Sequence, residues 1–419
     1  MKRYLSALFL FFIFLAMYYA GSFTKIPFAD CLGFVLDVEK GKWIGTSAAT
    51  THFLYVNTVI AIKNLTGLNA IEANRLLVIF SGAATVSVIY LAVKSITKTE
   101  WASVTAAIVF GLSFTFWRNA EIVEVYTYNC LWLSLFFLTI IKTFVENKKK
   151  YILLSGLFLG ISLWLHIQNI LLIPAFLVFL FYFRHEKKYA YSSLLIFGLL
   201  FSSLFLLNTL QGLPFTSVYS SEHGTWVEDS FKKTFIQYVN DLIKSLAYLI
   251  YNFNLFTFFG LIGIVLLYKA NRKMFYVFLT GAVCVYGFST FYAVSDNYVF
   301  FLPFNIIFAL SIGYGLSAPK YAVVKKFSWV CLLIPLGYLA IYTAAFSTEK
   351  GRAFHTSKQH KGGLNYFILP WMNNNPGILE FTIDDKTAPE PVEWMKTIAR
   401  EYIELMKTKG YTEEELRKL

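Results

Sequence analysis

Long apolar runs alternate with short polar segments along most of the chain. About eleven runs approach the ~20 residues that an α-helix needs to cross a bilayer. They lie at residues 4–22, 76–93, 101–117, 128–144, 151–165, 170–183, 192–207, 246–268, 274–291, 299–316 and 327–346. The first run has no clean small-residue cleavage site, so we expect an uncleaved helix rather than a signal peptide. The pattern predicts an all-α, polytopic membrane protein with about eleven transmembrane helices.

Two long polar stretches separate some of these runs. The first, residues 24–67, predicts a large outer loop, in which the amphipathic residues 51–63 are expected to lie along the interface. The second covers residues 208–244 and predicts either a cover over a site or a solvated connector. The first stretch is too polar to span the bilayer.

The chain changes character after the last apolar run. The polar tail predicts an amphipathic helix over residues 392–409, and Thr412 with Glu415 forms a capping box for a short final helix. We therefore predict a transmembrane domain over residues 1–346 and a small extracytoplasmic domain over residues 347–419.

Composition and charge agree with a membrane protein. The chain is 57% hydrophobic and 15% charged, which is not typical of a soluble domain. Its net charge of +12 comes largely from Lys and Arg clusters in alternate loops, as the positive-inside rule requires. We expect a multi-pass protein of the cell membrane with its amino end cytoplasmic and its tail outside, and no nucleic-acid partner.

The four cysteines show neither a CxxC pair nor a metal-ligand spacing. This pattern excludes a disulfide scaffold and a zinc site, although one bridge between Cys31 and Cys130 stays open. We predict no metal ligands, and dependence on a divalent metal is left undecided.

With this topology, many polar groups fall at the outer ends of the spans or in the outer loops. They are Asp30, Asp37, Glu39, His52, Arg118, Glu121, Glu124, His166, His223 and Asp296. A transporter would place such groups near the middle of the bilayer, where the predicted spans carry none. We expect a site that faces the outer leaflet.

The densest polar string is FTFWRNAEIVEVYTYN, residues 114–129. One interpretation is an aromatic belt at the headgroup level in which Arg118 snorkels. Glu121 and Glu124 favour a site instead, because acids three residues apart share a helical face and need water or a polar partner.

This string resembles the W…aEvYalN motif of a polytopic family related to the animal protein O-mannosyltransferases of the TMEM260 type, in the GT-C superfamily. The matching residues are Trp117, Glu124, Val125, Tyr126 and Asn129. GLFLGISLWLHIQNILLIPA, residues 156–175, is similar to a second family segment and places His166 on the family histidine. DNYVFFLP, residues 296–303, resembles a third.

The opening loop resembles the family less closely. Asp30, His52 and Tyr55 match an acid, a histidine and a tyrosine of the family pattern, but the adjacent glutamate and two prolines are missing. Asp37 or Glu39 is a possible substitute for the second carboxylate.

The resemblance implies a GT-C-like glycosyltransferase that uses a polyprenyl-phosphate sugar as its donor substrate. It identifies no cofactor. We predict transfer of mannose or another hexose to a protein or glycan acceptor on the outer face, by inverting displacement with Asp30 as the general base. The predicted substrate-binding residues are His52, Tyr55, Arg118, Glu121, Glu124, Tyr126, Asn129 and His166. Arg118, with His52 or His166, would stabilise the departing phosphate.

Other interpretations stay open. The chain could be a non-catalytic flippase or transporter of lipid-linked glycans. Asp30 could cap a turn, His166 could be a satisfied interfacial histidine, and Asp296 could be a turn residue. A glycan polymerase or ligase is disfavoured because residues 208–244 contain one histidine and no arginine.

Overall fold

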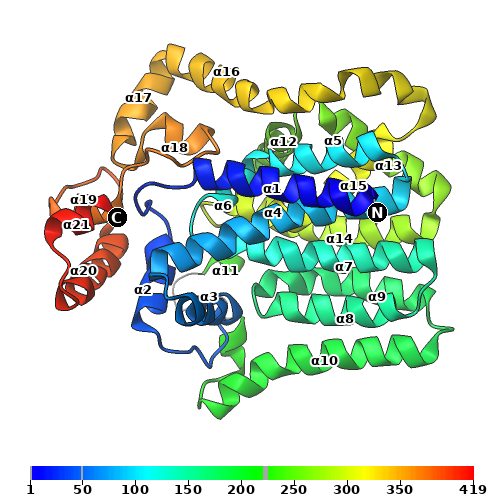
Figure 1. Ribbon diagram of the computed structural model, residues 1–419, viewed down its shortest axis with the longest axis horizontal. Helices are drawn as coiled ribbons and strands as arrows, with labels where there is room; N and C mark the ends of the chain where they lie inside the picture. The colour runs from blue at the N-terminus through cyan, green and yellow to red at the C-terminus, as the bar shows by residue number, and fades with distance from the viewer. Residues whose placement is uncertain (1, 49–50, 220–224) are drawn as a thin grey trace.

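The computed structural model describes residues 2–48, 51–219 and 225–419, and its regular elements there are all helical. The membrane bundle consists of α1 (Lys2–Gly21), α4 (Ala70–Thr97), α5 (Glu100–Gly111), α6 (Phe114–Ala120), α7 (Tyr126–Glu146), α8 (Lys150–Leu163), η1 (Ile167–Leu172), α9 (Ile173–Tyr182), α10 (Lys187–Leu210), α12 (Phe235–Phe253), α13 (Phe256–Ala270), α14 (Arg272–Phe291), η3 (Asn297–Phe301), α15 (Leu302–Leu316), η4 (Pro319–Leu333) and α16 (Ile334–Ser347). Most of these helices run side by side along the long axis (Figure 1).

The remaining elements gather at one end of the bundle (Figure 1). From the opening loop come α2 (Cys31–Lys40) and α3 (Phe53–Thr66), and from the second polar stretch η2 (Phe215–Val218) and α11 (Trp226–Phe231). The tail supplies α17 (Glu349–Ser357), η5 (Gln359–Lys361), α18 (Leu364–Ile368), α19 (Ile378–Ile383), α20 (Glu393–Thr408) and α21 (Glu413–Lys418). The predicted tail helices are confirmed as α20 and α21, and Thr412 with Glu415 forms the capping box.

The all-α membrane fold is confirmed, but the predicted number of eleven spans is not. Within the described residues, 7 helices are long and apolar enough to cross a membrane, or up to 9 if each of two bent pairs is one span. The pair α5 and α6 bends by 67°, and α12 meets α13 at 102°. The other two predicted spans correspond to α8 and to η1 with α9, which are shorter. Hydropathy located the apolar helices, but it does not report where the backbone turns.

Glycines bring two bundle helices into direct backbone contact. A Cβ atom on Gly263 of α13 would lie 1.8 Å from the Ser311 carbonyl oxygen, and one on Gly315 of α15 would lie 2.0 Å from that of Phe259. Small residues allow such close approach between membrane helices. Within a bilayer, dispersion contacts rather than the hydrophobic effect favour the association of helices. The α13–α15 pair is therefore a close backbone-to-backbone contact within the bundle.

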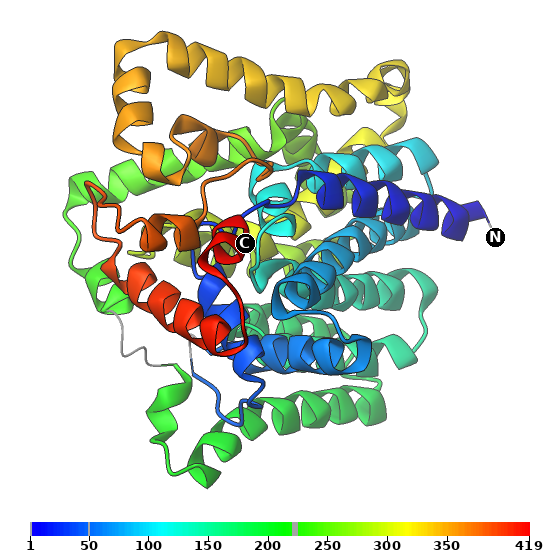
Figure 2. The ribbon, with the colours of Figure 1, turned by 60° about the vertical axis from the view of Figure 1, so that its left-hand side comes forward.

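The opening loop and the tail share one apolar core outside the bundle core. The Ile26 amide donates to the carbonyl of Leu419, the last residue, at 2.6 Å. Lys25 pairs with Glu380 across the same boundary at 2.5 Å. Figure 2 shows the tail helices covering the blue opening loop. The boundary at residues 346 and 347 stays a prediction, but the tail packs as part of the outer layer.

All four cysteines are free, and both Cys31 and Cys130 are buried. The bridge left open by the sequence is therefore not formed. Cys130 lies on α7, whereas Cys31 begins α2 in the outer layer.

Candidate active site

Three carboxyl groups from distant parts of the sequence lie within electrostatic reach of one another. Asp30 immediately precedes α2, Glu124 lies in the turn between α6 and α7, and Asp296 precedes η3. Glu124 is 8% exposed. Burial, then the Asp30 and Asp296 carboxylates, raise the pKa of Glu124. The tertiary structure thus forms an acid cluster at the outer end of the bundle.

Asp30 lies at the accessible side of this cluster. Its side chain is exposed and makes no capping hydrogen bond to α2. The capping role considered from the sequence is therefore absent. Enough protein surrounds the carboxyl for desolvation, and then the Asp296 charge, to raise the pKa of Asp30. Cys31, the next residue, forms a hydrogen bond with the backbone of Val123, which ties the start of α2 to the Glu124 turn.

His52 and His166 form a ring pair beside the acids, with centroids 5.1 Å apart. The His52 Nδ1–H donates to the Leu165 carbonyl at 2.6 Å, because a carbonyl can only accept. The Nδ1 of His166 instead accepts from the Gln168 amide at 3.3 Å. Burial lowers the pKa of both rings, so both are neutral at pH 7. In these tautomers the Nε2 of His52 is an acceptor and the Nε2–H of His166 is a donor.

His52 also has an uncommon backbone conformation. It is the residue before α3 and has φ 42° and ψ 47°, in the left-handed region that costs a non-glycine residue roughly 1–2 kcal/mol. The bond to Leu165 and the ring pair hold it there. Such local strain is more common at functional sites than elsewhere.

Arg118 lies 4% exposed near these groups and does not snorkel. Its guanidinium donates to the Tyr366 carbonyl and lies 4.2 Å from the centroid of the Tyr366 ring. It also forms a hydrogen bond with Tyr298. The sequence did not indicate Tyr366, because the tail matched the family weakly. Tyr298 lies in DNYVFFLP, which resembles a family segment, so that string was the available signal.

Three other predicted residues lie at or near this region. The Tyr126 ring lies 5.8 Å from that of His166, centroid to centroid. Asn129 accepts from Asn169 at 2.6 Å, next to the segment that carries His166. Tyr55 is buried and donates its hydroxyl to Asn74 at 2.8 Å, so its polar atom is already used.

Glu121 faces the tail rather than the acid cluster. Its carboxylate accepts from the indole of Trp117 at 2.5 Å and from the Met372 amide at 3.0 Å. Burial raises the pKa of Glu121 to about 8, against the lowering effect of these bonds. Its contacts join α6 to the tail, and a Cβ atom on Gly21 would collide with the carboxylate.

The two possible substitutes for a second carboxylate lie elsewhere. Glu39 pairs with Lys63 at 3.2 Å and with Lys409, and Asp37 is exposed on α2. Glu124 and Asp296 occupy the place beside Asp30. His223 lies outside the described residues.

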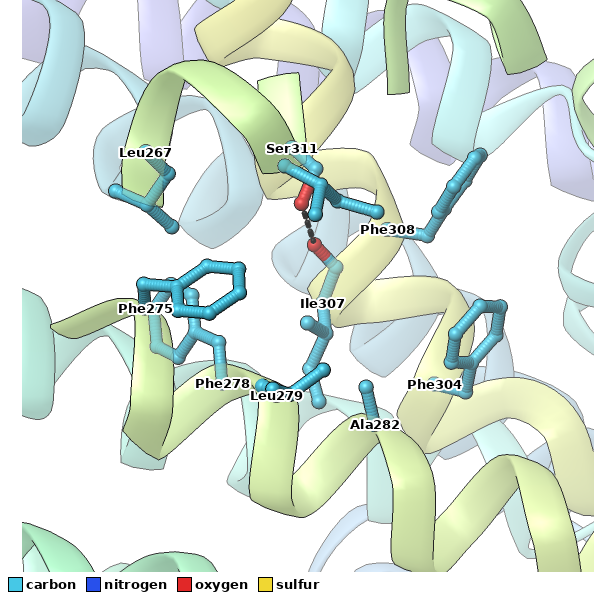
Figure 3. A pocket seen from close by; sticks show the side chains of 10 residues that line it. Leu267, Phe275, Phe278, Leu279, Ala282, Phe304, Ile307, Phe308 and Ser311 are labelled. Carbon is cyan, nitrogen blue, oxygen red and sulfur yellow. Dashed lines mark hydrogen bonds between the residues drawn. The ribbon is translucent and has the colours of Figure 1, made fainter. Parts of the chain in front are cut away.

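No group of three or more His, Cys, Asp or Glu side chains within the described ranges is arranged to hold a metal ion. Figure 3 shows a separate apolar cavity of about 40 Å³ between α13, α14 and α15. Its one hydroxyl, on Ser311, donates to the Ile307 carbonyl at 3.1 Å. None of the predicted site residues lines it.

Comparison with known proteins supports the resemblance found in the sequence. Residues 43–190 match the family model described as the protein O-mannosyl-transferase TMEM260 N-terminal domain. This range includes His52, Tyr55, Arg118, Glu124 and His166, and excludes Asp30, Asp296 and Tyr366. No curated protein matches the chain.

Solved structures with a similar fold include two of ArnT from Cupriavidus metallidurans. The apo form has a TM-score of 0.57 at 13% identity, with 84% of this chain and 67% of that chain covered. The form bound to undecaprenyl phosphate has a TM-score of 0.54 at 13% identity, covering 84% and 68%. The apo oligosaccharyltransferase of Archaeoglobus fulgidus has a TM-score of 0.51 at 12% identity, covering 84% of this chain and 59% of that chain.

The GT-C-like fold and the prediction of a membrane glycosyltransferase are thereby confirmed. Over residues 43–190, the chain resembles the family described as the protein O-mannosyl-transferase TMEM260 N-terminal domain.

Proposed function

We propose that this protein transfers mannose or another hexose from a polyprenyl-phosphate donor to a hydroxyl-bearing acceptor on the outer side of the membrane. The family match supports a mannosyl donor, and the neighbour ArnT has been solved with undecaprenyl phosphate. The observation that carries the proposal is the convergence of Asp30, Glu124 and Asp296 beside a histidine pair and a buried arginine.

Asp30 is proposed as the general base. As the acceptor oxygen bonds to the anomeric carbon, its proton passes to the Asp30 carboxylate, and the bond from that carbon to the phosphate oxygen breaks. The polyprenyl phosphate leaves with the electron pair. The accessible position of Asp30 suits contact with an incoming acceptor, whereas buried Glu124 suits a role in orienting the sugar.

The departing phosphate needs hydrogen-bond donors. Arg118 carries a permanent charge, and the Nε2–H of His166, which bonds no group in the described residues, is a neutral donor. His52 presents a lone pair instead, because its only N–H is bound to Leu165. We therefore assign the phosphate to Arg118 and His166, and to His52 a hydrogen bond from a sugar or acceptor hydroxyl.

The test is transfer from radiolabelled polyprenyl-phosphate mannose in membranes that contain the protein. Asp30→Asn is expected to lower the transfer rate by ~10²-fold or more, because the amide cannot take the proton. Asp385→Asn is the matched control, since this exposed tail residue pairs with Lys396, far from the acid cluster in sequence, and its φ of 47° suits asparagine.

Full transfer by Asp30→Asn would remove Asp30 from the role of base. Movement of labelled lipid across the vesicle membrane without a new glycosidic product would instead indicate a flippase. That result would refute the proposed function.

A further inference from the structure

A second cavity, of about 220 Å³, lies in the tail around α18 and the segment that follows it. Its lining includes Asn365, Tyr366, Trp371, Asn373, Asn374 and Asn375. The cavity therefore combines aromatic rings with four asparagines. None of these residues was predicted as part of the site.

Three of the four side-chain amides in this cavity are available to a ligand. In the described part of the chain, the amides of Asn365, Asn373 and Asn374 make no hydrogen bond, and all three residues are exposed. The backbone beneath two of them is held in place. The backbone N–H of Asn373 donates to the Gly21 carbonyl at 2.9 Å, and the backbone N–H of Asn374 donates to the Thr24 hydroxyl at 3.1 Å.

Asn375 has a different task. Its side chain bonds the backbone of Thr24 and of Lys25, at 3.1 Å and 2.6 Å, so it anchors the segment to the opening loop. The cavity is thus built on fixed main chain with three free amides, a preorganised arrangement that lowers the entropic cost of binding.

The charge in the cavity is compensated. Lys361 is its only ionisable side chain besides the tyrosine, and its ammonium pairs with Glu390 at 2.7 Å. This argues against a phosphate or another free anion as the ligand. Each primary amide offers two donors and an acceptor, which suits vicinal hydroxyl groups. The aromatic rings offer flat apolar faces.

The cavity also adjoins the reaction centre through Tyr366. This residue lines the cavity, stacks on Arg118, and donates its hydroxyl to the Phe28 carbonyl at 2.8 Å, two residues before Asp30. Trp371 packs against Trp117 of α6 with ring centroids 5.6 Å apart. A ligand held here would contact the residue that joins Arg118 to the segment preceding Asp30.

We propose that this cavity binds one neutral pyranose ring, with Trp371 or Tyr366 facing the ring and the amides of Asn365, Asn373 and Asn374 bonding its hydroxyls. A volume below the roughly 300–1,000 Å³ of drug-sized pockets suits a single ring rather than a longer chain. The role of that ring, as the acceptor's sugar or the donor's, rests on the proposed function. Binding itself does not.

The test is saturation-transfer NMR on the full chain in detergent, with methyl α-mannopyranoside as the probe. We expect binding with a dissociation constant on the order of millimolar. Trp371→Ala should weaken it by about tenfold, and Asn373→Ala by about threefold to tenfold. Trp394→Ala is the matched control, because Trp394 is 47% exposed on α20 and does not line the cavity.

Trp371→Phe keeps an aromatic face and should retain most of the affinity, which separates lost stacking from misfolding. Absence of saturation transfer, or equal transfer in Trp371→Ala and the wild type, would overturn the proposal. So would binding of a serine-rich peptide in place of the glycoside.

Two further binding measurements decide whether the bound pyranose ring belongs to the donor or to the acceptor. Displacement of the methyl mannoside by a short-chain prenyl-phosphate mannose would make it the donor's sugar, whereas simultaneous binding would make it the acceptor's. Either result supports a pyranose site. A protein that binds the glycoside but transfers no sugar would refute the proposed function and leave the cavity's assignment intact.

Discussion

At the scale of single residues, the surroundings of Asp30 decide the pH at which it can act as a base. A base must be deprotonated, so transfer falls as pH drops through its pKa. Desolvation and the Asp296 carboxylate both raise that pKa, which moves the acid limb of the rate profile above the ordinary aspartate range.

Asp296→Asn removes one cause of this shift. The pKa of Asp30 should then fall, and the acid limb of kcat/KM should move to lower pH, because the carboxylate form persists further into acid. The measurement is a pH profile of mannose transfer, with Asp385→Asn as the reference. An unmoved acid limb would show that Asp296 does not act on the base.

Arg118 provides a second residue-scale prediction. Its planar guanidinium serves the Tyr366 carbonyl, the Tyr366 ring and Tyr298 together, a geometry that a lysine ammonium cannot reproduce. Arg118→Lys should lower transfer by about tenfold or more while keeping the positive charge. Arg352→Lys, on exposed α17, is the control, and equal activity of the two variants would count against a phosphate-binding role.

At the scale of elements, the contact between α13 and α15 depends on glycine. Gly263→Ala places a methyl group 1.8 Å from a backbone oxygen, so the helices must separate. We expect a loss of about 1–3 kcal/mol in the free energy of unfolding, measured in detergent.

Gly287→Ala on α14 is the matched control, because a Cβ atom there meets nothing within 4 Å. Alanine has the higher helix propensity, so this variant should be neutral or stabilised by up to about 1 kcal/mol. A Gly263→Ala protein as stable as the wild type would contradict the close crossing.

At the scale of the whole molecule, the tail completes the outer layer and the environment of Arg118. Deletion of residues 349–419 removes Tyr366 from Arg118 and Leu419 from Ile26, and it exposes the apolar core shared with the opening loop. We expect the truncated chain to remain in the membrane, lose transfer, and become sensitive to protease between residues 23 and 67.

Limited proteolysis with mass spectrometry checks this expectation. Lys407→Ala, which breaks an exposed ion pair with Glu413, should leave the protease resistance unchanged. A truncated chain with a protected opening loop would show that the loop folds without the tail.

The site was only partly predictable from the sequence. Asp30, His52, Arg118, Glu124 and His166 were all proposed, from their expected outer location and from the family resemblance. The structure brings Asp30 together with Glu124 and pairs the two histidines. The side chains of Glu121 and Tyr55 form hydrogen bonds within the fold. The structure also adds Tyr298 and Tyr366 to the site as partners of Arg118.

The sequence by itself determined the membrane class, the all-α content and the positions of the apolar helices, because hydropathy and helical periodicity are local properties of the chain. Only the tertiary structure decided the bends, the span count and the partners of each polar group. Arg118 and Tyr366 are 248 residues apart, and no local pattern records such a contact. Their meeting depends on how the tail packs against the opening loop, which is a property of the folded whole.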